Sequence, residues 1–166
     1  MPPPRGPAGG SSGPATAGLD AADVTRLLTG SHHDPHGPLG ARVLTEGVVL
    51  RVLRPGATEV HAVVDGVVHP LSRLHPDGLF GALLPGLQAI PDYRLRIRYD
   101  DQVFDSDDPY RFLPTLGALD LHLISEGRHE RLWDVLGAHV RSYPAGGTSV
   151  TGTSFAVWAP NARGVR

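Results

Sequence analysis

The 166-residue sequence contains no cysteine and no lysine, and aromatic residues make up only 6% of it. Without cysteine, a disulfide framework, a thiolate metal site and a cysteine nucleophile are all excluded. No apolar run approaches the ~20 residues that a membrane-spanning helix needs. The first 18 residues also lack the apolar segment of a secretory signal. We therefore expect a cytoplasmic location and no membrane partner.

Charge of either sign is scarce and nearly balanced. All 15 basic residues are arginine, and they stand against 17 acidic residues, for a formal net charge of −2. Proteins that bind nucleic acid through its phosphates concentrate positive charge on one face. The sequence offers no such excess, so we expect no nucleic-acid partner.

The N-terminal region divides into a tail and a short helix. After Met1, residues 1–18 contain no large apolar side chain, which predicts a disordered tail. Asp20 is a suitable N-cap, and a second aspartate, Asp23, lies in the expected first turn, where negative charge is favourable. The apolar residues of this helix share one face, and Gly30 is placed to end it. They are Val24, Leu27 and Leu28.

Short apolar runs separated by Gly, Pro and Asp turns come next, which is the pattern of antiparallel strands. In the last run, Tyr93, Leu95, Ile97 and Tyr99 alternate with arginines, as in a strand with one buried face. The repeated short strands predict a mainly β chain whose residues 19–105 form an immunoglobulin-like β-sandwich. The expected strands are 48–53, 60–64, 67–71, 79–84 and 93–99.

The pattern weakens from residue 106 onward. We expect a connector over 106–152, with a strand at 119–124 and a short helix at 128–136. Residues 154–160 then begin an apolar strand shortly before the sequence ends. Because one strand does not make a domain, we expect this chain to be a piece of a longer protein.

Several segments resemble the N-terminal region of bacterial glycogen branching enzymes. Residues 32–40 resemble its N-terminal loop, and residues 52–57 resemble this region as well. The longest and most specific similarity runs through residues 108–133. Residues 155–162 resemble the opening strand of a starch-binding-type module (carbohydrate-binding family 48), a segment that debranching and trehalose-forming relatives share.

The resemblance implies an enzyme of four parts: two β-sandwiches, a (β/α)8 barrel and a C-terminal β domain. The barrel would cut α-1,4 bonds and form α-1,6 branches, but its motifs are absent here, so no catalytic residue and no cofactor is expected. The chain would be an accessory region that positions α-glucan chains for the catalytic barrel of the parent chain. The implied divisions are a tail (1–18), the N-terminal sandwich (19–105), a connector with the start of a second module (106–152) and that module's first strand (153–166).

A histidine-rich loop is the sharpest candidate for a metal site. Histidine and carboxylate are suitable zinc ligands, and His32, His33, Asp34 and His36 lie close together. However, two adjacent histidines do not easily aim at one ion, and Asp34 followed by proline is typical of a turn. We therefore expect a structural turn and no metal.

Two groups of carboxylates also have structural interpretations. The aspartates at 105, 107 and 108 lack the ligand order of a calcium loop, which favours a solvated linker. Glu130 and Asp134 share one face of the expected helix, but a glycosidase needs its two carboxyl groups facing each other across a cleft. We expect them to be surface charges, as is nearby Glu126.

Sugar binding is the remaining candidate, because sugar rings stack on aromatic faces beside a few polar groups. Tyr110 and Trp133 are the substrate-binding candidates, and Trp158 is expected in a core. Other readings stay open: a free-standing carbohydrate-binding module, a spacer without a ligand, or the N-terminus of a debranching or trehalose-pathway enzyme.

Overall fold

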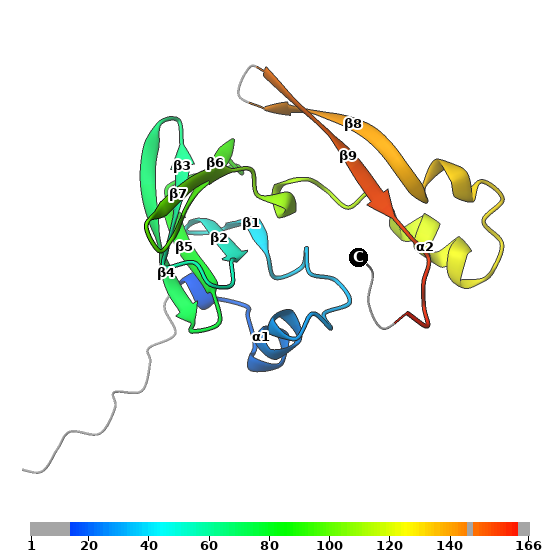
Figure 1. Cartoon of the computed structure of the whole chain (residues 1–166), viewed down its shortest axis with the longest axis horizontal. Helices are drawn as coiled ribbons and strands as arrows, with labels where there is room; N and C mark the ends of the chain where they lie inside the picture. Colours follow the sequence, from blue (N-terminus) through cyan, green and yellow to red (C-terminus); the bar gives the residue numbers. More distant parts are fainter. Residues whose placement is uncertain (1–13, 146–147, 163–166) are drawn as a thin grey trace, which may run out of the picture. The chain divides into compact units, whose positions relative to one another are not determined.

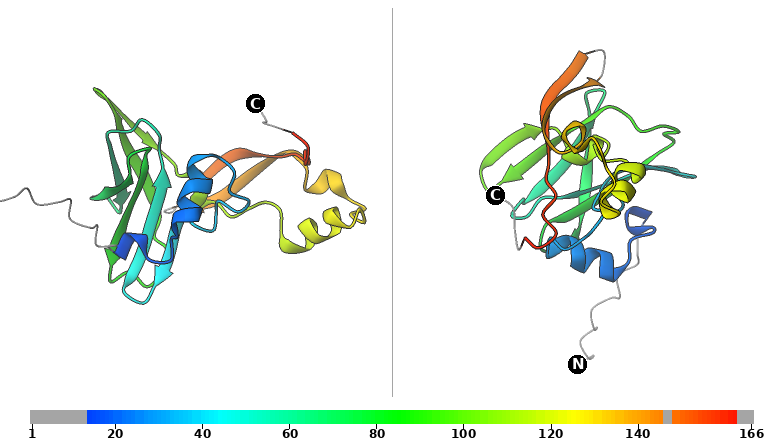
Figure 2. Two further views of the ribbon diagram at one scale, coloured as in Figure 1. Left: turned by 90° about the horizontal axis from the view of Figure 1, so that it is seen from below. Right: turned by 90° about the vertical axis from the view of Figure 1, so that its right-hand side faces the viewer.

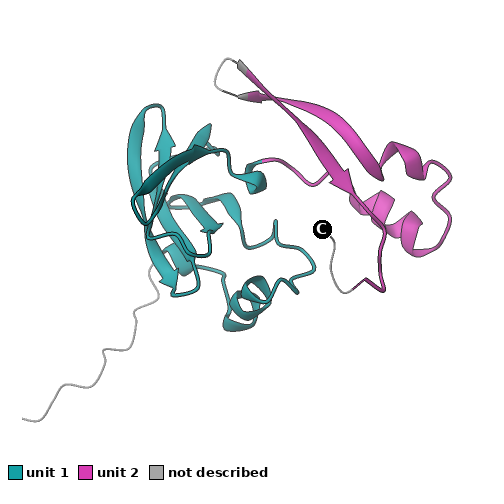
Figure 3. Cartoon of the chain, viewed as in Figure 1, with its two compact units in different colours: residues 1–111 teal, residues 112–166 magenta. Residues whose placement is uncertain are grey.

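The computed structural model describes residues 14–145 and 148–162, which form two compact units (Figure 3). The first unit ends at Arg111, and the second begins at Phe112. Most of the predicted tail, residues 1–13, lies outside the described residues. The divisions expected at 105 and 152 remain predictions.

The first unit is a β-sandwich made of one seven-stranded antiparallel sheet that folds over itself (Figure 1). The strand order is β1-β2-β5-β4-β3-β6-β7. The fold occurs within β4, because Leu71 pairs with Val60 of β3 whereas the next residue, Ser72, pairs with Gly81 of β5. The strands are β1 (Gly40–Leu44), β2 (Gly47–Leu53), β3 (Glu59–Val64), β4 (Val67–His75), β5 (Leu79–Pro85), β6 (Tyr93–Tyr99) and β7 (Gln102–Ser106).

Inward-facing residues of both layers form the core. On β6 the predicted alternation is confirmed, because Tyr93, Leu95 and Ile97 are buried and the arginines between them are exposed. Burial of this apolar surface is the main favourable term in folding. The other core residues are Ala57, between β2 and β3, and residues of β2, β3, β4 and β5: Val48, Leu50, Val52, Val60, Ala62, Val64, Leu71, Phe80 and Leu84.

A smaller cluster covers the outer face of β2 and β5. Helix α1 (Ala21–Leu28) contributes Leu27, which packs with Leu39 and Leu79, and Figure 2 shows α1 beside these strands. The predicted cap is confirmed, because the Asp20 side chain accepts a hydrogen bond of 2.6 Å from the amide of Asp23. The strand β2 is therefore buried on both faces.

The prediction of a disordered tail was wrong for residues 14–18. Residues 14–16 form a 3-10 turn, η1 (Pro14–Thr16), and the carbonyls of Ala15 and Ala17 accept hydrogen bonds from Arg51. Arg51 lies on β2 and is 2% exposed. A buried guanidinium needs several hydrogen-bond acceptors. The carbonyls of Ala15 and Ala17 supply two of them, which explains why this segment is ordered although its side chains are small.

The second unit contains helix α2 (Ala118–Ser125), the 3-10 turn η3 (Leu132–Asp134) and a hairpin of β8 (Gly137–Ala145) and β9 (Thr148–Ala156). The strand expected at 119–124 was wrong: the leucines alternate with Asp120 and His122 as in a strand, but these residues lie in helix α2. The helix expected at 128–136 was also wrong and is only the turn η3. The last strand begins and ends earlier than expected and already has β8 as its partner.

None of the described residues of the second unit is buried. Trp158, expected in a core, is 56% exposed. The exposed large apolar residues of this unit are Leu113, Leu119, Leu121, Leu132, Trp133, Val140, Phe155, Val157 and Trp158. No helix in residues 14–145 or 148–162 is long and apolar enough to cross a membrane.

Candidate functional site

A buried carboxylate stands at the end of the first unit. Asp108 precedes the 3-10 turn η2 (Pro109–Arg111) and is fully buried. The hydroxyl of Tyr93 donates a hydrogen bond to its Oδ2 over 2.8 Å, and the amide of Tyr110 donates to its Oδ1 over 3.3 Å. The guanidinium of Arg54 lies 3.6 Å from the same Oδ1. The expectation of a solvated linker was therefore wrong for this residue.

The surroundings of Asp108 shift its protonation equilibrium in two directions. Burial raises the pKa of Asp108 above its ordinary value, while the donors and the positive charges of Arg54 and Arg111 act to lower it. Burial also raises the pKa of Tyr93, and the neighbouring carboxyl group of Asp108 adds to that rise. A carboxyl group enclosed in this way holds the fold together and has no access to a substrate.

Arg111, the last residue of η2, also holds this turn in place through hydrogen bonds. Its Nη1 donates to the carbonyl of Tyr93 over 2.8 Å and to Asp107 over 3.0 Å, and its Nη2 contacts Asp92. The guanidinium also lies 5.8 Å from the centre of the Tyr93 ring. Arg111 and Asp108 together fix η2 to β6.

Tyr110, the first sugar-binding candidate, is half-buried against the small apolar cluster. Its ring meets His36 edge to face, with centroids 5.1 Å apart. Burial raises the pKa of its hydroxyl group. The ring therefore already has packing partners on the protein.

Trp133, the second candidate, lies in η3 of the second unit and is 68% exposed. An exposed indole offers the apolar face on which a sugar ring stacks. Tyr110 belongs to the first unit and Trp133 to the second.

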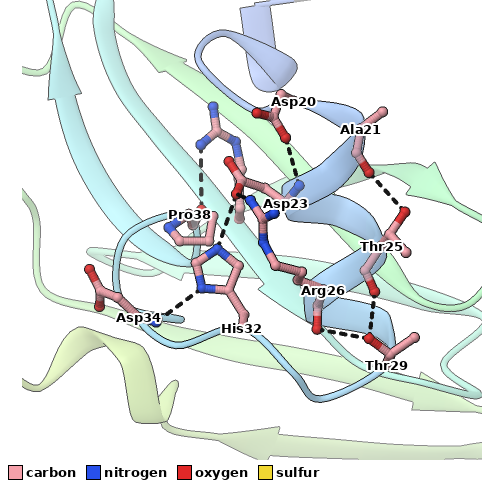
Figure 4. Close-up of polar contacts among 10 residues, drawn as sticks. Asp20, Ala21, Asp23, Thr25, Arg26, Thr29, His32, Asp34 and Pro38 are labelled. Atoms are coloured by element: carbon pink, nitrogen blue, oxygen red, sulfur yellow. Dashed lines mark hydrogen bonds and ion pairs between the residues drawn. The ribbon is translucent and has the colours of Figure 1, made fainter.

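The histidine-rich loop is held by internal hydrogen bonds (Figure 4). The Nε2 of His32 lies 3.2 Å from an oxygen of Asp23, and its Nδ1 accepts from the amide of Asp34. Arg26, 2.5 Å from the same oxygen, and then His32 lower the pKa of Asp23. Among the described residues, no group of three or more acidic or histidine side chains could hold a metal ion.

The carboxylates of the second unit do not form a glycosidase pair of the expected kind. Asp134 lies 2.7 Å from Arg131 in an exposed ion pair, and Glu126 lies 3.5 Å from Arg128. Glu130 precedes η3, so it does not share a helical face with Asp134. Exposed pairs of this kind contribute little to stability.

Sequence reasoning missed Asp108, Arg111 and Arg51 as partners in buried networks. For Asp108 there was one usable signal. Tyr93 occupies an inward position on its strand, and a buried tyrosine hydroxyl needs a hydrogen-bond partner. Nothing in the local sequence marks Arg51, because its acceptors lie 13 to 36 residues earlier.

Comparisons with known proteins agree on the region that this chain resembles. Residues 20–110 match the family described as alpha-1,4-glucan branching enzyme GlgB, N-terminal domain. The chain is 55% identical to the 1,4-alpha-glucan branching enzyme GlgB of Frankia casuarinae over 87% of its own length and 18% of that protein. It is 53% identical to GlgB 2 of Streptomyces coelicolor over 100% of its length and 22% of that protein. The chain thus spans about a fifth of the length of these relatives.

A weaker likeness concerns solved structures. A pullulanase from Paenibacillus barengoltzii overlaps 48% of this chain and 15% of its own, with 19% identity and a TM-score of 0.36. An overlap of this size supports no conclusion about function.

Proposed function

Because the chain belongs to the family of the alpha-1,4-glucan branching enzyme GlgB N-terminal domain, we propose that it is the non-catalytic front part of such an enzyme. In this role it positions α-glucan chains for a catalytic barrel that the parent chain supplies. The observation that carries the proposal is the 53% identity to the Streptomyces coelicolor enzyme along the whole of this chain. A cytoplasmic location is part of the proposal, and a chain without cysteine is compatible with it.

The chemistry of the described residues supports an accessory role. The most strongly enclosed carboxyl group, Asp108, is fully buried and engaged by Tyr93 and Arg54. The exposed aspartates at 105 and 134 are paired with arginines. Acid/base catalysis of glycoside cleavage needs two carboxyl groups open to the substrate, and these carboxylates do not provide such a pair.

We place the proposed glucan contact at Trp133, with Tyr110 as the second residue. Trp133 is the better placed, because its side chain is 68% exposed whereas the Tyr110 ring packs against His36. A sugar ring can stack on an exposed aromatic side chain without any catalytic group. Because every glucose unit of an α-glucan presents a similar ring, one exposed indole can bind at many positions along the polymer.

Affinity electrophoresis in native gels containing glycogen tests this proposal on the 166-residue chain. We expect the chain to be retarded by glycogen, and we expect Trp133→Ala to lose most of that retardation. Trp158→Ala is the matched control, because Trp158 is 56% exposed and belongs to the same unit. Tyr110→Phe keeps the ring and should bind as the parent does.

Two results would count against the proposal in different ways. A chain whose mobility is the same with and without glycogen would be a spacer without a sugar ligand. Equal loss of retardation in Trp133→Ala and Trp158→Ala would show that glycogen adsorbs non-specifically to the exposed apolar surface and that Trp133 forms no sugar site.

A further inference from the structure

Helix α2 ends in a turn that leads the chain back toward the start of the helix. Gly127 has a φ of +67°, which glycine adopts without strain. The amide of Gly127 donates to the carbonyl of Ile124 over 3.0 Å, and the amide of Arg128 donates to that of Leu123 over 2.8 Å. These two bonds are those of a Schellman motif. As a result, the next side chain, His129, reaches the first turn of α2.

His129 is held at both nitrogens of its ring. Its Nε2 lies 3.1 Å from Oδ1 of Asp120, and its Nδ1 accepts a hydrogen bond of 3.2 Å from the amide of Arg131. A ring nitrogen that accepts from an amide carries no hydrogen. The ring is therefore neutral, and the hydrogen on Nε2 is donated to Asp120. The His129 side chain is 9% exposed, in a unit where no described residue is buried.

Asp120 is itself fixed at the start of the helix. It is the third residue of α2, and its Oδ2 accepts a hydrogen bond of 2.9 Å from the amide of Gly117, the N-cap residue. This bond and then the contact with His129 lower the pKa of Asp120 from its ordinary value of 3.8. The carboxyl group of Asp120 therefore stays ionised in mildly acidic solution.

The other end of these contacts is the 3-10 turn η3, which carries Trp133. Arg131 is the N-cap residue of η3, and its carbonyl accepts a hydrogen bond of 3.1 Å from the amide of Asp134. The side chains of Arg131 and Asp134 also form an ion pair of 2.7 Å. Trp133 thus lies between two residues that are bonded to each other. Through its amide, Arg131 is bonded to His129 and thereby to α2.

The same arrangement occurs in the first unit, where it holds a turn without a tryptophan. The Nε2 of His32 lies 3.2 Å from Asp23, and its Nδ1 accepts from the amide of Asp34 over 3.1 Å (Figure 4). The Nδ1 of His75 likewise accepts from the amide of Asp77 over 3.2 Å. In each case the ring accepts from the amide two residues later, as an asparagine or aspartate side chain does in an Asx turn. A histidine in this place loses its acceptor when Nδ1 is protonated.

From these contacts we propose that His129 is the positioning residue for Trp133, and that it makes the glucan contact of Trp133 dependent on pH. The inference rests on the function proposed above, because it concerns the same tryptophan. In the neutral form, His129 fixes the N-cap of η3, and the exposed indole is held in one place. A side chain that is already held in its binding position loses less freedom when a ligand binds. Protonation of Nδ1 releases the amide of Arg131, so the indole moves more freely and binds glucan less tightly.

The charged groups around the ring favour this response. Asp120 faces Nε2 from α2 and attracts the protonated ring, so the ring stays beside the helix while η3 is released. His122, also on α2, is 62% exposed and lies 3.6 Å from Glu126. The other ionisable side chains of the same loop are exposed, and they are Arg128, Glu130 and Arg131.

The test uses the 166-residue chain with Trp158→Phe, which leaves Trp133 as its single tryptophan. Time-resolved fluorescence anisotropy reports how freely the Trp133 indole moves, and co-sedimentation with glycogen reports glucan binding. Both are measured at about pH 8 and about pH 5, the limits of the range in which histidine ordinarily changes its charge. The parent is compared with His129→Asn, with His129→Leu and with the matched control His122→Asn.

In the parent, we expect the indole to be held at the higher pH and freer at the lower pH. Glycogen binding should be about two- to tenfold weaker at the lower pH, the range that one hydrogen bond spans. His129→Asn supplies an acceptor of the Asx type that does not titrate, so the indole should stay held at both pH values. His129→Leu supplies no acceptor, and at either pH it should behave as the parent does at the lower pH. His122→Asn should follow the parent.

Three results would overturn the inference. The first is an indole that moves equally freely at both pH values in the parent. The second is a dependence on pH that persists in His129→Asn, because it would then come from another group, such as His139, whose Nε2 lies 3.0 Å from the carbonyl of Leu136. The third is glycogen binding that stays constant while the indole is released.

Failure of the proposed function gives a different result. A chain that does not sediment with glycogen at either pH contradicts the glucan contact of Trp133. The anisotropy is measured without glycogen, so it still decides whether His129 positions the indole.

Discussion

Tyr93 donates its hydroxyl hydrogen to the Oδ2 of Asp108 over 2.8 Å, and both side chains are buried. This bond joins strand β6, whose inward residues line the core, to the segment that follows the last strand of the sandwich. Residue 108 opens the stretch that is most specific to the branching-enzyme resemblance. The structure gives that stretch a physical role, because it closes the first unit.

Removing the hydroxyl group should therefore destabilise the first unit. Tyr93→Phe leaves one oxygen of Asp108 without its donor in a buried place, which costs about 1–3 kcal/mol. Urea unfolding followed by circular dichroism measures the loss. Tyr99→Phe is the control, since Tyr99 ends the same strand and is only partly buried. Equal losses in both variants would contradict a specific role for the bond to Asp108.

The raised pKa of Asp108 predicts how its contribution depends on pH. A carboxyl group with a folded pKa above its unfolded value binds protons more tightly when folded. Its contribution is complete below the unfolded value of about 3.8 and is lost as the pH rises through the folded pKa. The stability advantage of the natural chain over Asp108→Asn should thus be larger at pH 4 than at pH 7. An advantage that grows toward pH 7 would show that Arg54 outweighs burial.

Alanine substitutions at Gly40 and Gly66 distinguish the cost of backbone strain from the cost of steric crowding. Gly40 and Gly66 have φ values of +82° and +79°, so alanine at either position incurs about 1–2 kcal/mol of strain. A methyl group on Gly40 would also meet the Tyr110 carbonyl at 2.7 Å, whereas one on Gly66 would meet nothing within 4 Å. Gly40→Ala should therefore lower the urea midpoint clearly more than Gly66→Ala. Equal midpoints would mean that the contact with Tyr110 is not tight in solution.

The buried arginine of β2 should control the order of the residues before α1. Arg51→Met keeps much of the side-chain volume but removes the donors to Ala15 and Ala17. Burial, and after it the positive charge of Arg42, lowers the pKa of Arg51, a sign that its charge is poorly solvated. We expect proteases to cleave near residues 14–18 much faster in this variant. Arg42→Met, on the exposed face of β1, is the control and should resist cleavage like the parent chain.

Regular alternation made the sandwich predictable. On β6, each inward residue was identified from the sequence alone, and the cap at Asp20 followed from its side-chain chemistry. The fold of the sheet within β4 was not predictable, because pairing partners far apart in the sequence leave no local trace.

The second unit was predicted less well for a physical reason. The leucines at 119, 121 and 123 alternate with Asp120 and His122, which is the periodicity of a half-buried strand. The helix is instead marked by Asp120, which accepts from the amide of Gly117 at 2.9 Å and pairs with His129. Trp158 was expected in a core and is exposed, because the sequence does not show which partners a strand has.

The central claim is that this chain, chiefly through Trp133, positions glucan chains for a barrel elsewhere in the parent enzyme. The most direct measurement uses a hybrid in which this chain replaces the matched front part of the Streptomyces coelicolor relative, in its natural form and as Trp133→Ala. Each enzyme is given the same linear α-1,4-glucan, and the branch lengths of the product are determined after debranching. The claim predicts that Trp133→Ala changes the distribution of branch lengths at a largely retained rate of branching. Identical distributions would contradict it.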